Sequence, residues 1–241
     1  MSVMNTGMIK YLETIVGCGF FHHISKSDWI EAFEQLEVTL RTCRKGEIIC
    51  HMGDTLEAVY IVEDGSVRAE KTYPNGDVHI VSVYEEDDVL ALGVILSRRK
   101  TSPVDLVANE DCRMIMIPRQ SMEGSRYRDR LMNALIEMLA DENIRQMHKI
   151  EILAERGLRD RVLVYLNVLT RKSGTNTVTV KMSREQLAQY LCVNRSALSN
   201  ELSKMKREGL IDFQKDQFTL LQAGLKAATD QGLGPDSGEE G

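Results

Sequence analysis

The chain has 241 residues, of which 43% are hydrophobic and 27% charged, and its formal net charge is -6. These proportions are ordinary for a soluble globular protein, and no apolar run approaches the roughly 20 residues needed to cross a bilayer. The N-terminus lacks a basic start followed by an apolar core and a small-residue cleavage site, so no secretory signal is predicted. We therefore expect a cytoplasmic protein without a membrane segment, and the length favours two domains.

The cysteines argue against a disulfide framework, a zinc site and an iron-sulfur site. Their number is odd, and they are widely scattered without any Cys-x-x-Cys pair. Free cysteine behaves as a small hydrophobic residue, so buried or idle thiols are favoured. The five positions are Cys18, Cys43, Cys50, Cys112 and Cys192.

Residues 38–117 consist of short β-branched runs that are separated by turn signals. The dipeptides Asp64-Gly65 and Asn75-Gly76 lie between alternating hydrophobic runs and are strong hairpin signals. This half is predicted to be antiparallel β, as a sandwich, a barrel or a jelly roll, among which turn spacing does not choose. Helical periodicity in residues 26–36 predicts a helix that flanks the sheets.

Residues 126–156 contain neither proline nor glycine and predict one long helix, which Gly157 ends before a second amphipathic helix over residues 158–171. Two apolar strips run along the long helix. The N-terminal strip is expected to face the chain's own sheet and comprises Leu131, Leu135, Met138 and Leu139. The other has coiled-coil spacing and comprises Ile136, Ala140, Asn143, Met147, Ile150 and Ala154. This second strip favours a dimer helix, with Asn143 as the polar residue of the seam; packing on the chain's own sheet is the alternative.

The segment MSREQLAQYLCVNRSALSNELSKMKREGLIDF predicts two short helices joined by a tight turn. Ser183 is placed to cap the first helix, and Asn194 to cap the second. After Gly209, the runs LIDF and FTLL flank residues 214–217 as a hairpin. Together these elements predict a winged helix-turn-helix.

The exposed face of the second helix has the chemistry of base recognition. Arginine pairs with the O6 and N7 atoms of guanine, asparagine pairs with the N6 and N7 edge of adenine, and small serines permit close approach. Residues 194–207 carry four basic side chains against one glutamate, a local charge of +3 on an acidic chain. An ordinary helical hairpin with a solvated polar face is the alternative. The predicted DNA-contacting residues are Ser183, Arg184, Asn194, Arg195, Ser196, Ser199, Asn200 and Lys204.

From Phe20 to about Leu221 the chain resembles the Crp/Fnr family of bacterial transcription regulators. The resemblance is carried by YIVEDGSVRAEKTYPNGDVHIVSVYEEDDVLAL, by the long helix entering LAERGLRDRVLVYL, and by SREQLAQYLCVNRSALSNELSKMKREGLI. It implies an α+β chain: an effector-sensing, cyclic-nucleotide-binding-like jelly roll (residues 1–125), a dimerisation helix (126–156), a winged helix-turn-helix (157–223) and a flexible tail (224–241). It also implies a homodimer on a palindromic operator in double-stranded DNA, with RNA polymerase as a further candidate partner.

The resemblance fails at positions that set ligand and operator choice. Arg195 matches the family's base-contacting arginine, but Ser196 and Asn200 replace the glutamate and arginine of the cyclic-AMP-responsive member, so a different operator is expected. Where nucleotide-binding members hold ribose and phosphate, this chain reads Leu90-Ala91-Leu92 and Ser102-Pro103. A buried phosphate without a cation is costly, so cyclic AMP is not expected.

An unidentified small organic effector is expected instead. Residues 98–100 are basic, but a solvated surface turn is the favoured interpretation of them. No cofactor is identified: only Cys18 lies near the N-terminus for an iron-sulfur cluster, and no spacing among the histidines indicates haem. The candidate pocket comprises Leu92, Gly93, Ser102, Val104, Asn143 and Met147, and the histidines are His22, His23, His51, His79 and His148.

Two other functional classes compete with a DNA-binding regulator. An enzyme on a cupin-like sheet requires metal ligands such as a His-x-His pair with a carboxylate, and the strands offer only the separated His51 and His79, so neither a metal site nor an enzyme is expected. An interaction module without DNA affinity is the other alternative; it predicts that Arg195 and Asn200 are dispensable for operator binding.

Overall fold

A computed structural model describes residues 19–230 and divides the chain into two compact units, residues 1–143 and 144–241. The boundary lies inside a long helix, and each unit is built around its own cluster of buried apolar side chains. The segment considered above for a secretory signal, Cys18 and the acidic C-terminal end lie outside the described residues. Within residues 19–230, no helix is both long enough and apolar enough to span a membrane.

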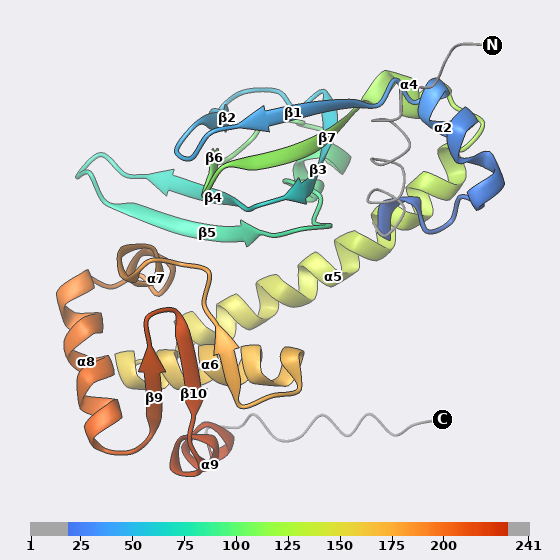
Figure 1. Cartoon of the computed structure of the whole chain (residues 1–241). Coiled ribbons are helices and arrows are strands. Elements are labelled where there is room, and N and C mark those ends of the chain that lie inside the picture. The colour runs from blue at the N-terminus through green and yellow to red at the C-terminus, as the bar shows by residue number, and fades with distance from the viewer. Residues whose placement is uncertain (1–18, 231–241) are drawn as a thin grey trace. The chain divides into compact units, whose positions relative to one another are not determined.

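The first unit is a jelly roll of seven described strands in two antiparallel sheets (Figure 1). The strand orders are β1-β7-β3 and β2-β6-β4-β5, which confirms the predicted antiparallel jelly roll. The strands are β1 (Thr39–Cys43), β2 (Ile48–Cys50), β3 (Ala58–Asp64), β4 (Val67–Thr72), β5 (Val78–Tyr84), β6 (Asp105–Ala108) and β7 (Cys112–Pro118).

The two glycine turns behave differently. Asn75-Gly76 closes the β4–β5 hairpin, as predicted. The hairpin expected at Asp64-Gly65 is wrong, because this turn joins β3 to β4, which belong to opposite sheets. A turn motif reverses the chain locally but does not determine which strands then pair. Gly65 has φ +86°, and a Cβ there would lie 2.6 Å from the Asp111 carbonyl oxygen, so the turn packs directly against the start of β7.

Apolar side chains fill the space between the two sheets, and short helices close the unit. Among the fully buried side chains are Phe20, Phe21, Leu36, Ile61, Leu90, Met114 and Ile117. The predicted flanking helix is present as a 3-10 turn followed by an α-helix. The short helices are η1 (Gly19–Phe21), η2 (Lys26–Asp28), α2 (Trp29–Gln35), α3 (Leu92–Leu96) and α4 (Arg119–Gly124).

The long helix α5 (Arg128–Ala154) carries its two apolar strips as the sequence spacing predicts. Leu131 and Leu135 are buried in the first unit's core, and Met138 and Leu139 pack against that core. Every member of the heptad strip is exposed, including Ile136 at 57%, Met147 at 59% and Ile150 at 68%. The heptad strip is therefore not used by the chain's own core.

The second unit is a helical domain with a three-stranded sheet of order β8-β10-β9. The expected hairpin is β9–β10, and β8 extends it by one strand that the sequence analysis did not predict. The elements are α6 (Leu158–Ser173), β8 (Thr177–Thr179), α7 (Arg184–Tyr190), α8 (Arg195–Arg207), β9 (Ile211–Gln214), β10 (Gln217–Leu220) and α9 (Gln222–Asp230).

Helix α9 occupies residues that were expected to begin a flexible tail at residue 224. Its apolar residues Leu225 and Ala228 pack into the second unit's core. A Cβ at Gly224 would overlap the Leu210 carbonyl oxygen, so the backbone of α9 approaches the start of β9 closely. This ordering depends on tertiary packing, which a short segment next to an acidic, glycine-rich end does not reveal.

Candidate nucleic-acid interface

Two capped helices build the candidate interface. The Ser183 hydroxyl accepts a hydrogen bond from the Gln186 backbone N–H at 3.2 Å, and the Gln186 side chain accepts one from the Ser183 N–H at 2.8 Å. The Asn194 side-chain oxygen accepts from the Ala197 N–H at 2.7 Å. Both predicted N-caps are therefore confirmed, and they determine where α7 and α8 begin.

The turn between the helices is short and tightly bonded. Cys192 has φ +56°, and the Val193 N–H donates to the Ala188 carbonyl at 2.9 Å. On the inner face of α8, Leu198, Leu202 and Met205 are almost completely buried. The register of α8 is consequently fixed by the core, and its opposite face is directed to solvent.

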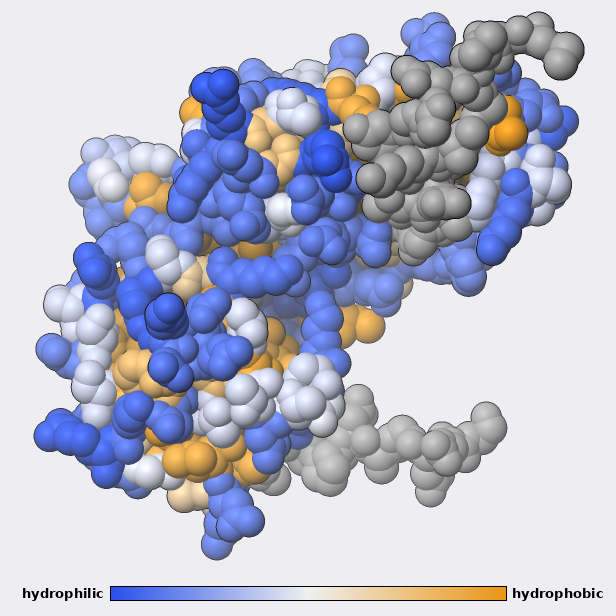
Figure 2. All heavy atoms as spheres, in the orientation of Figure 1, coloured by the Kyte–Doolittle hydropathy of each residue, from blue (hydrophilic) through white to orange (hydrophobic). Residues whose placement is uncertain are grey.

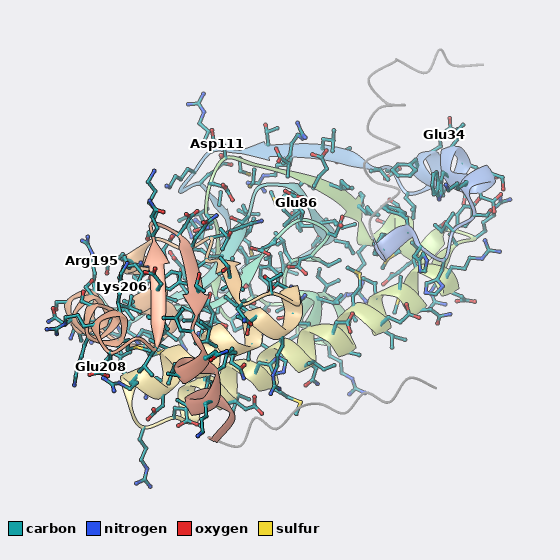
Figure 3. All side chains as sticks on the ribbon, turned by 60° about the horizontal axis from the view of Figure 1, so that its bottom comes forward. Glu34, Glu86, Asp111, Arg195, Lys206 and Glu208 are labelled. Atoms are coloured by element: carbon teal, nitrogen blue, oxygen red, sulfur yellow. The ribbon has the colours of Figure 1, made fainter. Side chains whose placement is uncertain are left out.

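The structure places the predicted DNA-contacting residues on this outer surface. Five of them lie in or just before α8 and are exposed: Asn194, Arg195, Ser196, Asn200 and Lys204. Ser183 is exposed at the start of α7, whereas Ser199 and Arg184 are partly buried. Figure 3 labels Arg195, Lys206 and Glu208, of which Arg195 begins α8 and Glu208 follows its last residue.

The charges on α8 are arranged so that its acidic group faces inward. Arg159 on α6 pairs with Glu201 at 2.8 Å and with Glu208 at 2.7 Å. These contacts neutralise the single acid within α8 and attach the helix to α6. Arg195 is the first residue of α8, where the helix dipole disfavours a cation. A cation at this end lowers the stability of the isolated helix, but together with the helix dipole it attracts an external anion.

The hairpin is fastened to the helices by cations stacked on aromatic rings. The Arg184 guanidinium lies 4.5 Å from the Phe218 ring centre and 5.0 Å from that of Phe213, and it donates to the Lys215 carbonyl at 3.2 Å. The Lys206 Nζ atom also lies over the Phe213 ring, 5.1 Å from the ring centre. Burial lowers the pKa of the Arg184 guanidinium from its ordinary value. Arg184 therefore holds the wing, a role that the sequence analysis missed because the rings lie about 30 residues away; its DNA contact stays a prediction.

The predicted effector residues are heterogeneous in their surroundings. Leu92 belongs to the apolar core of the first unit, and Leu90 beside it is fully buried. Ser102 is buried and its hydroxyl donates to the Val104 carbonyl at 2.7 Å. Gly93, Asn143 and Met147 are exposed and Val104 is partly buried. The positions that would hold a ribose and a phosphate thus carry apolar or internally bonded groups.

Comparison with known proteins places both units in one family. Residues 40–125 match the model of the cyclic nucleotide-binding domain, and residues 129–225 match that of the Crp-like helix-turn-helix domain. The order of the two matches along the chain is decisive, because it joins a jelly roll to this particular DNA-binding fold. The chain belongs to the Crp/Fnr family of bacterial transcription regulators.

Similar members of the Crp/Fnr family come from several bacteria. The chain is 23% identical over 193 residues to the global nitrogen regulator of Synechococcus elongatus, covering 77% of this chain and 87% of that protein. It is 24% identical over 205 residues to the transcriptional regulatory protein btr of Bordetella pertussis, covering 82% and 84%. FixK2 from Bradyrhizobium japonicum shares the fold with a TM-score of 0.67 and 22% identity, over 80% of this chain and 96% of that structure.

Proposed function

We propose that this Crp/Fnr protein binds a palindromic operator as a homodimer and reads the bases with α8. The observation that carries the proposal is the outer face of α8, where Arg195 and Asn200 are exposed on a helix fixed by caps and core. A helix-turn-helix places its second helix in the major groove with N-terminal residues at the base edges. Arg195 is then suited to guanine and Asn200 to adenine.

The homodimer is supported by the unpartnered strip on α5. Its exposed members recur at heptad spacing and include Ile136, Met147 and Ile150, each more than half exposed. On the face drawn in Figure 2, by contrast, most residues are hydrophilic and the apolar areas between them are small. Apolar side chains at a and d positions lose this exposure when a second α5 packs against them. Asn143 would lie in the same seam, where a polar residue favours one register.

The effector is proposed to be a small organic molecule and not cyclic AMP. Buried Leu90 and Leu92 offer no carboxylate for ribose hydroxyls, and the Ser102 hydroxyl is bonded to its own loop. Arg98 and Arg99 are exposed, so neither supplies the buried cation that a phosphate requires. RNA polymerase is proposed as a further partner. The family resemblance is the only support for this partner, since no surface of the described residues specifies it.

Selection of bound sequences from a random DNA library tests the proposal. The purified full chain is expected to enrich a two-fold symmetric motif with half-sites about one helical turn apart, at a stated salt concentration. Running the selection with and without a pool of small metabolites shows whether binding depends on an effector. Weak, salt-sensitive binding without sequence preference under both conditions would contradict the proposal and favour an interaction module.

Replacing Arg195 by alanine is expected to weaken binding to the selected operator by about 1 to 3 kcal/mol, because a bidentate contact to guanine is lost. The loss should be confined to specific DNA, so the ratio of operator to random-DNA affinity falls about 5- to 150-fold. Titration of labelled operator and random duplex, followed by fluorescence anisotropy, measures both affinities.

The matched control for this variant is Arg207→Ala, which removes the same charge from an exposed position at the other end of α8. A contact to phosphate alone weakens both duplexes alike, so the Arg207 variant should retain the specificity ratio. Equal behaviour of the two variants would show that Arg195 contributes charge only.

A further inference from the structure

Two buried cysteines lie opposite each other on neighbouring strands of the first unit. In the antiparallel pairing of β1 with β7, Cys43 is directly opposite Cys112, at the end of one strand and the start of the other. Both thiols are free and both residues belong to the jelly-roll core, at 4% and 5% exposure. Directly opposed residues of an antiparallel pair project from the same face of the sheet. The sequence spacing gave no indication of this pairing, since 69 positions separate the two residues.

The strand register satisfies the main geometric requirement for a disulfide. Opposed Cα atoms in antiparallel strands lie about 4.5 to 5.5 Å apart, inside the roughly 4.4 to 6.8 Å range of disulfide-bonded cysteines. The Cβ atoms of opposed residues lie about 4.5 to 5.5 Å apart, and a disulfide requires about 3.5 to 4.5 Å. Closing the bond therefore needs a shift of about 1 Å, which the ends of two strands accommodate more readily than their centres.

The surroundings pack tightly against one member of this pair and raise the pKa of both thiols. A Cβ at Gly65 would lie 2.8 Å from the Cys112 Cβ, so the β3–β4 turn packs tightly against Cys112. Burial raises the pKa of the Cys112 thiol to about 11. Burial and a hydrogen bond with Glu47 raise the pKa of the Cys43 thiol as well, and the neighbouring Arg41 guanidinium opposes that rise only in part. Both thiols are therefore protonated at neutral pH, and only a small thiolate fraction is available to react.

We propose that Cys43 and Cys112 form an intramolecular disulfide when the protein is exposed to hydrogen peroxide, locking the first strand of the jelly roll to the last. The thiolate of one of the two cysteines attacks one peroxide oxygen, which becomes the sulfenic acid oxygen while the other oxygen leaves as water after protonation. The sulfur of the second cysteine then displaces that sulfenic oxygen as a second water. Two thiols lose two electrons and two protons, and the peroxide is reduced to two waters. Because both thiols are buried, the reaction is expected to be slow.

Peptide mapping of the oxidised full chain tests this proposal directly. The reduced protein is treated with hydrogen peroxide for minutes to hours, its remaining thiols are blocked under denaturing conditions, and it is digested with trypsin. Cleavage after Arg41 and Arg44 releases TCR with Cys43, and cleavage after Lys100 and Arg113 releases TSPVDLVANEDCR with Cys112. The expected product is these two peptides joined, two hydrogen atoms lighter than their sum.

Cys50 provides the matched control, because it is similarly buried at 6% but lies on β2 opposite Leu106 in the other sheet. The Cys50→Ala variant should form the crosslink, whereas Cys43→Ala and Cys112→Ala should not. Peptide mapping of the wild-type chain does not require any variant to fold. It therefore remains a valid test of the proposal if a substitution destabilises the core. Absence of the joined peptide after partly buried Cys192 has been oxidised, or linkage of Cys50 as often as Cys43, would overturn the proposal.

Thermal unfolding supplies a second readout that separates a crosslink from simple thiol oxidation. The disulfide closes a loop containing most of the jelly-roll strands, so the oxidised wild type should unfold several degrees higher than the reduced protein. Trp29 is the single tryptophan of the chain and lies in this unit, so its fluorescence reports the transition. Oxidation of the Cys43→Ala variant should not raise the midpoint. A lower midpoint on oxidation of the wild type would count against the crosslink.

Discussion

Glutamate in place of Ile150 is expected to dissociate the proposed homodimer and abolish tight operator binding. Ile150 is 68% exposed in the single chain and occupies a seam position of the heptad strip on α5. In a two-fold seam the substitution removes two apolar side chains, each worth about 1.5 to 3 kcal/mol on burial, and places two carboxylates close together. Dimer affinity should fall by at least about 100-fold. Sedimentation equilibrium measures the change in oligomeric state.

The same variant should lose about 10²- to 10⁴-fold in affinity for the full operator, because two linked half-sites bind far more tightly than one. Its affinity for an isolated half-site should remain unchanged, since α8 is intact. The matched control is Arg145→Glu: Arg145 is exposed and, two residues from both Asn143 and Met147, points about 160° away from them on the helix. Dissociation of both variants, or of neither, would contradict the assigned seam.

Methionine in place of Lys149 is expected to raise the free energy of unfolding of the second unit at pH 7 and to remove part of its pH dependence. Lys149 is 8% exposed, donates to the Tyr190 carbonyl, and lies over the Tyr190 ring. Burial lowers its pKa from 10.5 to about 7, an effect that Cys192 partly opposes. Each pKa unit corresponds to about 1.4 kcal/mol, so the charged form costs the folded state a few kcal/mol.

The sign follows from proton binding in the two states. Between pH 7 and pH 10.5 the unfolded chain holds a proton on Lys149 and the folded chain does not, so wild-type stability rises with pH across this window. Below pH 7 the penalty is present in full. The Lys149→Met variant should therefore exceed the wild type most at pH 6, and the difference should shrink by about 1.4 kcal/mol per pH unit above pH 7.

Urea unfolding at fixed protein concentration between pH 6 and 9.5 measures this difference. Far-UV circular dichroism follows the helices, while fluorescence of Trp29 follows the first unit and should be unaffected. Lys204→Met is the matched control, because Lys204 is exposed on α8. Parallel stability curves for wild type and the Lys149 variant would show that this side chain stays protonated when folded.

Local signals in the sequence predicted much of the second unit. The caps Ser183 and Asn194, the buried spacing of α8 and the wing all depend on interactions within a few residues, and the structure has them where expected. The antiparallel strands of the first unit were also predicted correctly, because turn signals and alternation determine strand type, whereas the jelly roll itself was expected from the family resemblance. Whether Asp64-Gly65 leads to a paired strand depends on the opposite sheet, and that prediction failed.

The features that sequence analysis missed are all tertiary. The stacking of Arg184 on Phe218 joins residues 34 positions apart, and Arg159 reaches Glu201 from a different helix. In the sequence, Lys149 is one polar residue among many on a long helix. Its burial against the Tyr190 segment is visible only in the structure. Likewise α9 is ordered by its packing on the core and by the close backbone approach at Gly224. None of these has a local motif.

The pairing of β1 with β7 also constrains how the chain folds during synthesis. Within the described residues, β1 has β7 as its single strand neighbour, so the first strand of the jelly roll remains unpaired until residues 112–118 have left the ribosome. At about 5 to 20 residues per second, that interval lasts several seconds or more, with apolar strand edges unprotected. The helices of the second unit contact partners that are closer in the sequence, and such local contacts form faster than the pairing of distant strands. We therefore expect a nascent chain of this protein to be most exposed to aggregation while its first half is being made.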